Sequence, residues 1–209
     1  MKTITIADNE TFLRTKSKEV VFPDDDLERY IKVLEAYFKE SDITLALASV
    51  QLGILKRIIY IKNSNLDLIN RKNNDLETED DKEYNEKRIL INPVIISKEG
   101  LTDYWEACAS CLDNIGHVKR PYKINLEYQD LEGVKHKDVY EGFEATVLSH
   151  EMDHLDGILH MDIADEVLNM PNLDDRMEFR KIHGYNIISK TGDYEELLNN
   201  SKKYVKSKN

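Results

Sequence analysis

The segment over residues 144–155 constrains the fold of this chain more than any other part of it. Its residues recur at helical spacing, and Gly157 predicts the end of the helix. His150 and His154 lie one turn apart on the same face of such a helix, so both imidazoles can bind one metal ion. Glu151 is placed to accept a proton from a metal-bound water molecule. The segment therefore predicts a metal-binding helix, against the plainer alternative of an amphipathic helix with two surface histidines.

Strand-like segments precede this helix, and helical segments follow it. A helix is expected over residues 24–40, a short strand-like motif ends at residue 53, and further strands are expected at residues 58–61, 89–96, 101–107, 122–129 and 134–140. Residues 63–88 are interpreted as a polar inserted loop, and surface helices are expected at residues 173–183 and 193–206. Because helices and strands do not alternate, this order predicts an α+β fold with antiparallel strands.

The charge of the chain argues against one broad class of function. With 29 basic and 40 acidic residues, the net charge is −11, which disfavours DNA binding because phosphate contacts need a positive surface. No apolar run is long enough for a membrane span, and residues 1–8 lack the apolar core of a signal peptide. Cys108 and Cys111 lie too close together for a disulfide framework. The sequence therefore predicts a cytoplasmic protein with reduced thiols.

Two histidines leave a catalytic metal site short of a third protein ligand, and three residues are candidates for it. His160 would complete the pattern His-Glu-x-x-His-x-x-Gly-x-x-His of metzincin proteases, in which Gly157 permits a turn back to the metal. Cys108 and Cys111 form a Cys-x-x-Cys pair, which is typical of a redox pair or, with two histidines, of a closed structural site. Spacing alone therefore permits a zinc metallopeptidase, a non-catalytic Cys/His metal-binding module, or a metallohydrolase with a cysteine ligand.

Three motifs, taken in order along the chain, resemble the signatures of peptide deformylases. Residues 45–53 (LALASVQLG) are similar to the first signature, Gly-x-Gly-Leu-Ala-Ala-x-Gln. Residues 106–110 (EACAS) are similar to the second, Glu-Gly-Cys-Leu-Ser, and residues 150–157 (HEMDHLDG) match the third. The resemblance extends over about residues 5–165, and jointly the three motifs are specific.

Within this resemblance, Cys108 rather than Cys111 aligns with the cysteine ligand, because Gly116, Val118 and Arg120 then keep the spacing of the family. The resemblance implies a peptide-deformylase-like α+β fold, in which antiparallel strands pack around a central metal-binding helix. It further implies a catalytic domain over residues 1–165 and a helical C-terminal extension over residues 166–209.

The implied activity is removal of the N-terminal formyl group from formyl-methionyl nascent polypeptides, with release of formate. Cys108, His150 and His154 would hold one divalent metal ion, Fe(II) in the cell, with zinc, nickel or cobalt in a purified sample. Glu151 would take a proton from the attacking water and return it to the leaving amine. The Gln51 amide and the backbone N–H after Cys108 would stabilise the charge on the formyl oxygen.

Several further residues are expected to support the site. Glu106 and Arg120 flank the cysteine strand and are expected to pair and fix it. Thr146 and Val147, one turn before the first histidine, would line the site of the methionine side chain. The residues expected against the substrate backbone are Ala46, Leu47, Ala107 and Ala109.

Some signature positions differ from the family pattern. The differences are Thr44 and Ala46 in place of glycines, Ser49 in place of alanine, Ala107 in place of glycine, Ala109 in place of leucine, and Ile115 in place of an arginine. Methyl groups added at glycine positions narrow a cleft or change its backbone. Because the residues that would touch the reacting atoms are retained, we expect these differences to change substrate affinity more than chemistry.

The C-terminus is the one basic stretch of the chain, with Lys202, Lys203, Lys206 and Lys208 within its last nine residues. A solvated helix end is the plainer interpretation. The sharper hypothesis is that this tail contacts ribosomal RNA near the exit of formyl-methionyl nascent peptides, as a C-terminal extension does in some members of the family.

Overall fold

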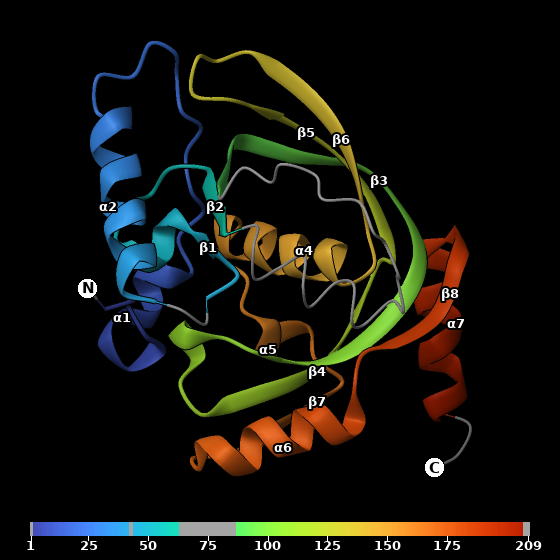
Figure 1. Ribbon diagram of the computed structural model, residues 1–209. Coiled ribbons are helices and arrows are strands. Elements are labelled where there is room, and N and C mark those ends of the chain that lie inside the picture. The colour runs from blue at the N-terminus through green and yellow to red at the C-terminus, as the bar shows by residue number, and fades with distance from the viewer. Residues whose placement is uncertain (1, 42–43, 63–86, 207–209) are drawn as a thin grey trace, which may run out of the picture.

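The strands of this protein curve around one central helix. The computed structural model describes residues 2–41, 44–62 and 87–206, and from residue 203 onward it describes the backbone alone. The helices are α1 (Ile6–Leu13), α2 (Leu27–Glu40), α4 (Phe143–Leu155), α5 (His160–Ile163), α6 (Leu173–His183) and α7 (Tyr194–Lys206), with 3-10 helices η1 (Ser49–Leu52) and η2 (Ala109–Cys111). The strands are β1 (Ala46–Ala48), β2 (Ile58–Lys62), β3 (Lys87–Ala107), β4 (Asn114–Arg120), β5 (Lys123–Gln129), β6 (Lys135–Glu141), β7 (Glu166–Asn169) and β8 (Asn186–Asp193). Helix α4 lies inside the curve of the strands, with α1 and α2 at one side and α6 and α7 outside (Figure 1).

Every pairing between these strands is antiparallel. The order β1-β2-β3-β4-β7 runs through the sheet, β5 pairs with β3 and β6, and β8 pairs with β3. The expected α+β fold, with antiparallel strands around the metal-binding helix and helices near the C-terminus, is confirmed.

Strand β3 joins two segments that the sequence predicts as separate strands, and that prediction is wrong. Gly100 lies between them with a φ of 71°, and a Cβ atom there would fall 2.5 Å from the carbonyl oxygen of Ser189. The register with β8 shifts at this point. The glycine therefore bends the strand instead of ending it, so one long strand pairs with β2, β4, β5 and β8.

Other expected boundaries also differ. Helix α2 begins at Leu27 and not at residue 24, because the backbone N–H of Asp26 donates to the Asp24 side chain at 3.0 Å in a turn ahead of the helix. The predicted polar loop ends before Lys87, with which β3 begins, and its residues 63–86 lie outside the described part of the chain.

The structure contains elements that the sequence analysis does not predict. Helix α1 begins with a capping box, in which Thr5 and Asp8 accept hydrogen bonds from each other's backbone N–H groups. Strand β4 lacks the alternation of apolar and polar residues that is typical of a strand, because its buried positions include Gly116 and Arg120. Strands β7 and β8 pair with β4 and β3, so the segment after residue 165 adds two strands to the two expected helices.

Helix α4 is enclosed by the rest of the molecule, and its buried residues are not confined to one stripe. They are Phe143, Ala145, Thr146, Leu148, Ser149, Glu151, Met152, His154 and Leu155. After the helix, Gly157 adopts a φ of 75°, and a Cβ atom there would lie 2.3 Å from the carbonyl oxygen of Arg14. This close approach fixes the end of the helix against the segment after α1, so the two histidines of α4 are held inside the sheet.

Candidate metal centre and active site

Three donor groups from two distant parts of the chain meet beside helix α4. Cys108 follows β3, while His150 and His154 lie on α4, and their donor atoms are within 4.8 Å of one another. The sulfur of Cys108 lies 3.2 Å from Nε2 of His154. A thiolate with two imidazoles suits zinc or a ferrous ion. Among the residues that the structure describes, this group includes neither Cys111 nor His160, which favours the cysteine-ligated hydrolase over the two alternatives left open by spacing.

A buried ion pair orients His150. Glu106, near the end of β3, accepts a hydrogen bond from Nδ1 of His150 at 2.8 Å. Arg120 on β4 donates to both carboxylate oxygens of Glu106, at 2.8 and 3.0 Å, and also to Asp153 on α4. With the proton on Nδ1, the lone pair of His150 Nε2 is available for a metal ion. Glu106 and Arg120 thus form the pair that the sequence predicts.

Both members of this pair are almost fully buried, each with 4% of its surface exposed. Burial alone would raise the pKa of Glu106, but the charge of Arg120 and the hydrogen bond from His150 hold it below its ordinary value. Burial alone would lower the pKa of Arg120, but the charges of Glu106 and Asp153 raise it further. Both groups therefore stay ionised, and the carboxylate of Glu106 is a fixed acceptor for the imidazole of His150.

One backbone N–H group, just before η1, holds the side chains of Gln51 on η1 and Glu151 on α4 next to each other. The backbone N–H of Ala48 donates to Glu151 Oε2 at 2.7 Å and to Gln51 Oε1 at 3.1 Å. With its oxygen held in this way, the Gln51 amide directs Nε2 to the Cys108 sulfur at 3.4 Å and to the Ser110 hydroxyl at 3.1 Å. Ala48 and Ser110 have no role predicted from the sequence, although both lie within the motifs that carry the resemblance.

The carboxylate of Glu151 is buried, with 5% of its surface exposed. Burial raises its pKa to about 7, even though the charge of His150 lowers it. A carboxylate with a pKa near neutrality is suited to both accepting and returning a proton.

The residues expected against the substrate backbone lie in two places. Ala107 is half-buried and Ala109 is exposed, on either side of Cys108. On β1, Ala46 packs in the hydrophobic cluster that contains α4, whereas Leu47 packs in the cluster against α2. The side chain of Leu47 therefore points away from the metal ligands, and only its backbone is available to this site.

Three aromatic rings, one of them from α4 itself, lie together at the N-terminal half of α4, where Thr146 and Val147 also lie. Phe143 contacts the rings of Tyr104 and Tyr185 edge-on, at centroid distances of 5.2 and 5.4 Å. The hydroxyl groups of Thr146 and Tyr185 are both buried near these rings. Tyr104 and Tyr185 are not predicted near this helix from the sequence, because both lie outside the motifs and no local pattern indicates their position.

A family model described as polypeptide deformylase matches residues 1–169. The chain belongs to this family. A peptide deformylase of Finegoldia magna is 35% identical over 165 residues, which covers 78% of this chain and 88% of the relative. The crystal structure of a probable peptide deformylase from Synechococcus phage S-SSM7 is 34% identical, with a TM-score of 0.59 over 78% of this chain and 98% of that one. A peptide deformylase from Synechococcus elongatus in complex with actinonin is 29% identical, with a TM-score of 0.61 over 79% and 81% of the two chains.

As a member of this family, the enzyme is a metal-dependent hydrolase that removes the N-terminal formyl group from nascent peptides. Its Cys108, His150 and His154 form the metal-binding group.

Two of the altered signature positions have structural partners of their own. The hydroxyl of Thr44 lies 2.6 Å from that of Ser41 and 3.3 Å from that of Tyr37, so it ties the entry of β1 to the end of α2. The hydroxyl of Ser49 is buried and donates to the backbone oxygen of Ile54 at 3.1 Å. These two side chains hold the first signature in place.

Two further altered positions point into the core. Ala46 packs in the cluster with α4, and Ile115 is fully buried on β4, opposite Ala107. Of the altered positions, only Ala107 and Ala109 keep exposed surface beside the cysteine, so we expect any change in substrate affinity to come from them.

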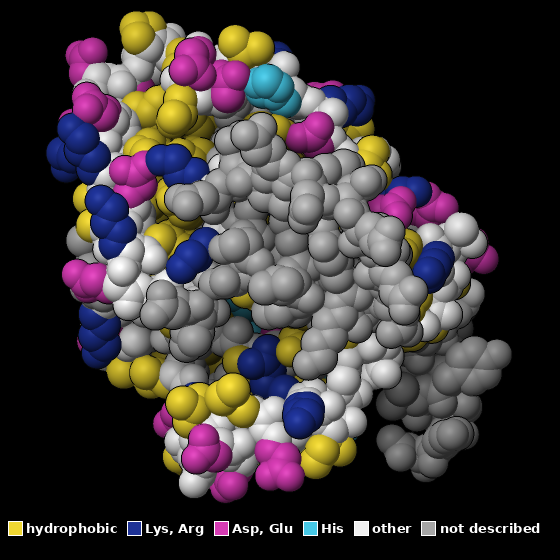
Figure 2. Space-filling model, in the orientation of Figure 1, with side chains coloured by type: hydrophobic (Ala, Val, Ile, Leu, Met, Phe, Trp, Pro, Cys, Tyr) yellow, Lys and Arg dark blue, Asp and Glu magenta, His cyan; other side chains and the backbone are white. Residues whose placement is uncertain are grey.

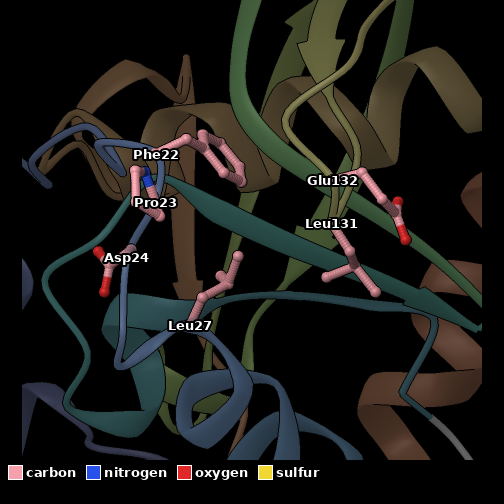
Figure 3. Close-up of a pocket in the computed structure, with 6 residues that line it drawn as sticks. All are labelled: Phe22, Pro23, Asp24, Leu27, Leu131 and Glu132. Atoms are coloured by element: carbon pink, nitrogen blue, oxygen red, sulfur yellow. The ribbon is translucent and has the colours of Figure 1, made fainter.

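A pocket of about 480 Å³ lies away from this centre, between the segment before α2 and the turn that joins β5 to β6 (Figure 3). It is lined by Phe22, Pro23, Asp24, Leu27, Leu131 and Glu132. The carboxylate of Asp24 is already paired with Lys56 at 2.8 Å. None of the metal ligands lines this pocket, so the chemistry described above does not use it.

The described rim of the face in Figure 2 carries acidic and basic side chains side by side. On α2, for example, Glu28 pairs with Lys32, and Arg29 pairs with Asp26 just before the helix. Within the described residues, every helix is too short or too polar to cross a membrane.

Proposed function

We propose that the enzyme cleaves the formyl amide of formyl-methionyl peptides at one divalent metal ion held by Cys108, His150 and His154. The supporting observation is the convergence of these three donors within 4.8 Å, beside the buried carboxylate of Glu151. Three protein ligands leave a position open, as a catalytic site requires. When bound, the metal acidifies a water molecule and polarises the formyl oxygen. We propose Fe(II) as the metal in the cell, with zinc, nickel or cobalt able to replace it, because this donor set suits all of them.

Glu151 acts as the proton carrier of the reaction. It accepts a proton from the water molecule that attacks the formyl carbon, and it then returns this proton to the leaving amine. The Ala48 N–H fixes one carboxylate oxygen at 2.7 Å, so the other oxygen is the one that exchanges the proton.

Two N–H donors next to Cys108 stabilise the charge on the formyl oxygen. The Gln51 amide is held with Nε2 beside the sulfur, and the backbone N–H of Ala109 follows the cysteine directly. Donors that are fixed before the reaction stabilise developing charge without a cost of reorganisation.

The methionine side chain of the substrate lies against Thr146 and Val147, one turn from His150. Phe143, packed on Tyr104, provides the apolar wall that a thioether side chain prefers. The substrate backbone lies along β1 at Ala46 and Leu47 and beside Ala107 and Ala109, which flank the metal-binding cysteine.

The remaining proposals concern the setting of the enzyme. We propose that residues 1–165 form the catalytic domain and residues 166–209 an extension joined to it by β7 and β8. The cytoplasm is its location, because formyl-methionyl nascent chains arise there. The basic end of the chain contacts the ribosome. Lys202 is exposed, whereas the side chains of Lys203, Lys206 and Lys208 lie outside the described residues. Deletion of residues 200–209 that left ribosome binding unchanged would exclude this contact.

The activity is tested by formate release from formyl-Met-Ala-Ser under anaerobic conditions, with the metal content measured alongside. Cys108→Ala is compared with Cys111→Ala, because both thiols are buried and only the first belongs to the metal group. We expect Cys108→Ala to lose both metal and turnover, and Cys111→Ala to keep both. Retention of metal by Cys108→Ala, or no turnover by the fully loaded wild type, would refute the proposal.

A further inference from the structure

His160 is a buried imidazole beside the metal centre that is not one of its three ligands. It begins α5, has 1% of its surface exposed and packs against β4. Its ring centroid lies 5.7 Å from that of His150, with the two ring planes inclined by 30°. The ring therefore packs beside that of His150, whose Nδ1 is held by Glu106.

The two nitrogens of His160 are the unusual feature. Both are buried, and neither has a hydrogen-bond partner among the described residues. A phenylalanine ring would fill the same space without the cost of burying two polar atoms. A buried polar group of this kind indicates a partner that protein atoms do not supply, such as an ordered water molecule.

Nδ1 of His154 is another buried ring nitrogen of the metal centre, and it needs a hydrogen-bond acceptor. Nε2 of His154 faces the Cys108 sulfur, and when this nitrogen binds the metal the proton is on Nδ1. This Nδ1 is buried without a partner in the described part of the chain. A metal-binding imidazole normally donates its other N–H to an acceptor. A neutral imidazole at His160 provides both a lone pair and a donor, and one water molecule can accept from His154 while it donates to His160.

The backbone of β4 makes room for this arrangement. A Cβ atom at Gly116 would lie 2.9 Å from Cδ2 of His160 and 2.9 Å from Cβ of Ala164. Any side chain at this position would therefore push the imidazole out of its place against His150.

We propose that His160 is a positioning residue of the metal centre, which supports the ring of His150 and holds a buried water molecule that accepts the Nδ1 proton of His154. This inference rests on the proposed ligands Cys108, His150 and His154. Its effect is to keep both imidazoles in the orientation and tautomer in which Nε2 binds the metal.

The test compares metal affinity with stability in His160→Phe. The metal-free protein is titrated with Co²⁺ against a chelator of known affinity, and the free energy of unfolding is measured on the same metal-free sample. We expect Co²⁺ affinity to fall roughly 10- to 100-fold. The metal-free variant should be at least as stable as the wild type, because two unpaired polar atoms have been removed. A residue that only packs would improve or preserve both quantities.

Two variants complete the design. His160→Gln keeps a donor and an acceptor, so it should regain part of the lost affinity. His136→Phe removes an exposed imidazole on β6 and should leave the affinity unchanged. Equal losses in His160→Phe and His160→Gln would overturn the role of the water molecule.

The outcomes separate this inference from the ligand assignment. An unchanged Co²⁺ affinity in His160→Phe, together with its loss in Cys108→Ala, overturns the role of His160 alone. Retained affinity in Cys108→Ala overturns the ligand assignment itself. If His160→Phe does not fold, Gly116→Ala displaces the same ring with its nitrogens intact, and unchanged affinity there likewise overturns the proposal. A crystal structure of the metal-bound enzyme should show water within about 3 Å of a His160 nitrogen.

Discussion

Replacing Glu151 with glutamine should make the metal-free protein more stable and the metal-loaded enzyme nearly inactive. Burial raises the pKa of this carboxyl to about 7, whereas in an unfolded chain it titrates near its ordinary value of 4.5. The folded protein therefore binds the proton more tightly than the unfolded chain does. As the pH rises from about 4.5 through about 7, the folded state loses stability because it must hold a buried charge.

The magnitude follows from this difference in pKa. A tenfold change in proton affinity corresponds to about 1.4 kcal/mol, so the buried charge costs about 3 kcal/mol at pH 8 and under about 1 kcal/mol at pH 5. The amide of glutamine is never charged and can still accept the hydrogen bond from Ala48. We therefore expect Glu151→Gln to stabilise the metal-free protein by about 3 kcal/mol at pH 8 and by much less at pH 5.

Urea unfolding of the metal-free proteins at both pH values, followed by fluorescence of the single tryptophan, Trp105, measures this effect. Glu178→Gln, on the exposed surface of α6, is the control. Its free energy of unfolding should differ from that of the wild type by the same small amount at both pH values. The loaded Glu151→Gln enzyme should keep its metal and lose roughly 100- to 10,000-fold in kcat. Equal stabilisation at pH 5 and pH 8, or none at either, would refute the reasoning.

Three further perturbations test other parts of the site. Glu106→Gln should weaken metal binding roughly 10- to 100-fold in a chelator competition and destabilise the fold by about 3–5 kcal/mol, since it breaks the buried pair with Arg120. Gly157→Ala should destabilise the protein more than Gly184→Ala in urea unfolding. Both glycines have positive φ, but only the first would place its new methyl group against backbone, whereas the second has nothing within 4 Å. The profile of kcat/KM against pH should fall tenfold per pH unit on the acid side, with a midpoint at or below about 7. Glu151 must be ionised to act, and the bound cation favours its ionised form. A kcat/KM that did not fall on the acid side would exclude Glu151 as the base.

The parts of the site that sequence predicts are those in which spacing alone determines position. His150 and His154 are brought together by one helical turn, and the helix over residues 144–155 is visible in the local pattern. The third ligand is not determined in this way. Cys108 reaches the histidines only because β3 curves past α4, and it was the resemblance to a family, not the spacing, that selected it.

His160 illustrates the opposite case. Its spacing from His154 fits a third metal ligand, yet spacing limits only how far a residue can reach along the chain. The turn at Gly157 sends the chain against Arg14 and then to β4, so the imidazole packs beside that of His150 and does not join the three grouped donors. Strand β4 itself was missed because its inward residues include Arg120, whose burial depends on Glu106 from another strand. No local pattern contains that information.

Several residues of the metal centre lower the stability of the folded protein. Glu151 carries a buried charge, His160 buries two ring nitrogens that have no partner among the described residues, and Glu106 needs Arg120 to remain ionised. Each of these is costly in a core, and all of them lie on or against α4. The apolar residues of the same helix, enclosed by the curved sheet, must offset this cost. Substitutions that stabilise the metal-free enzyme should therefore cluster around α4, and the same substitutions should weaken metal binding or turnover.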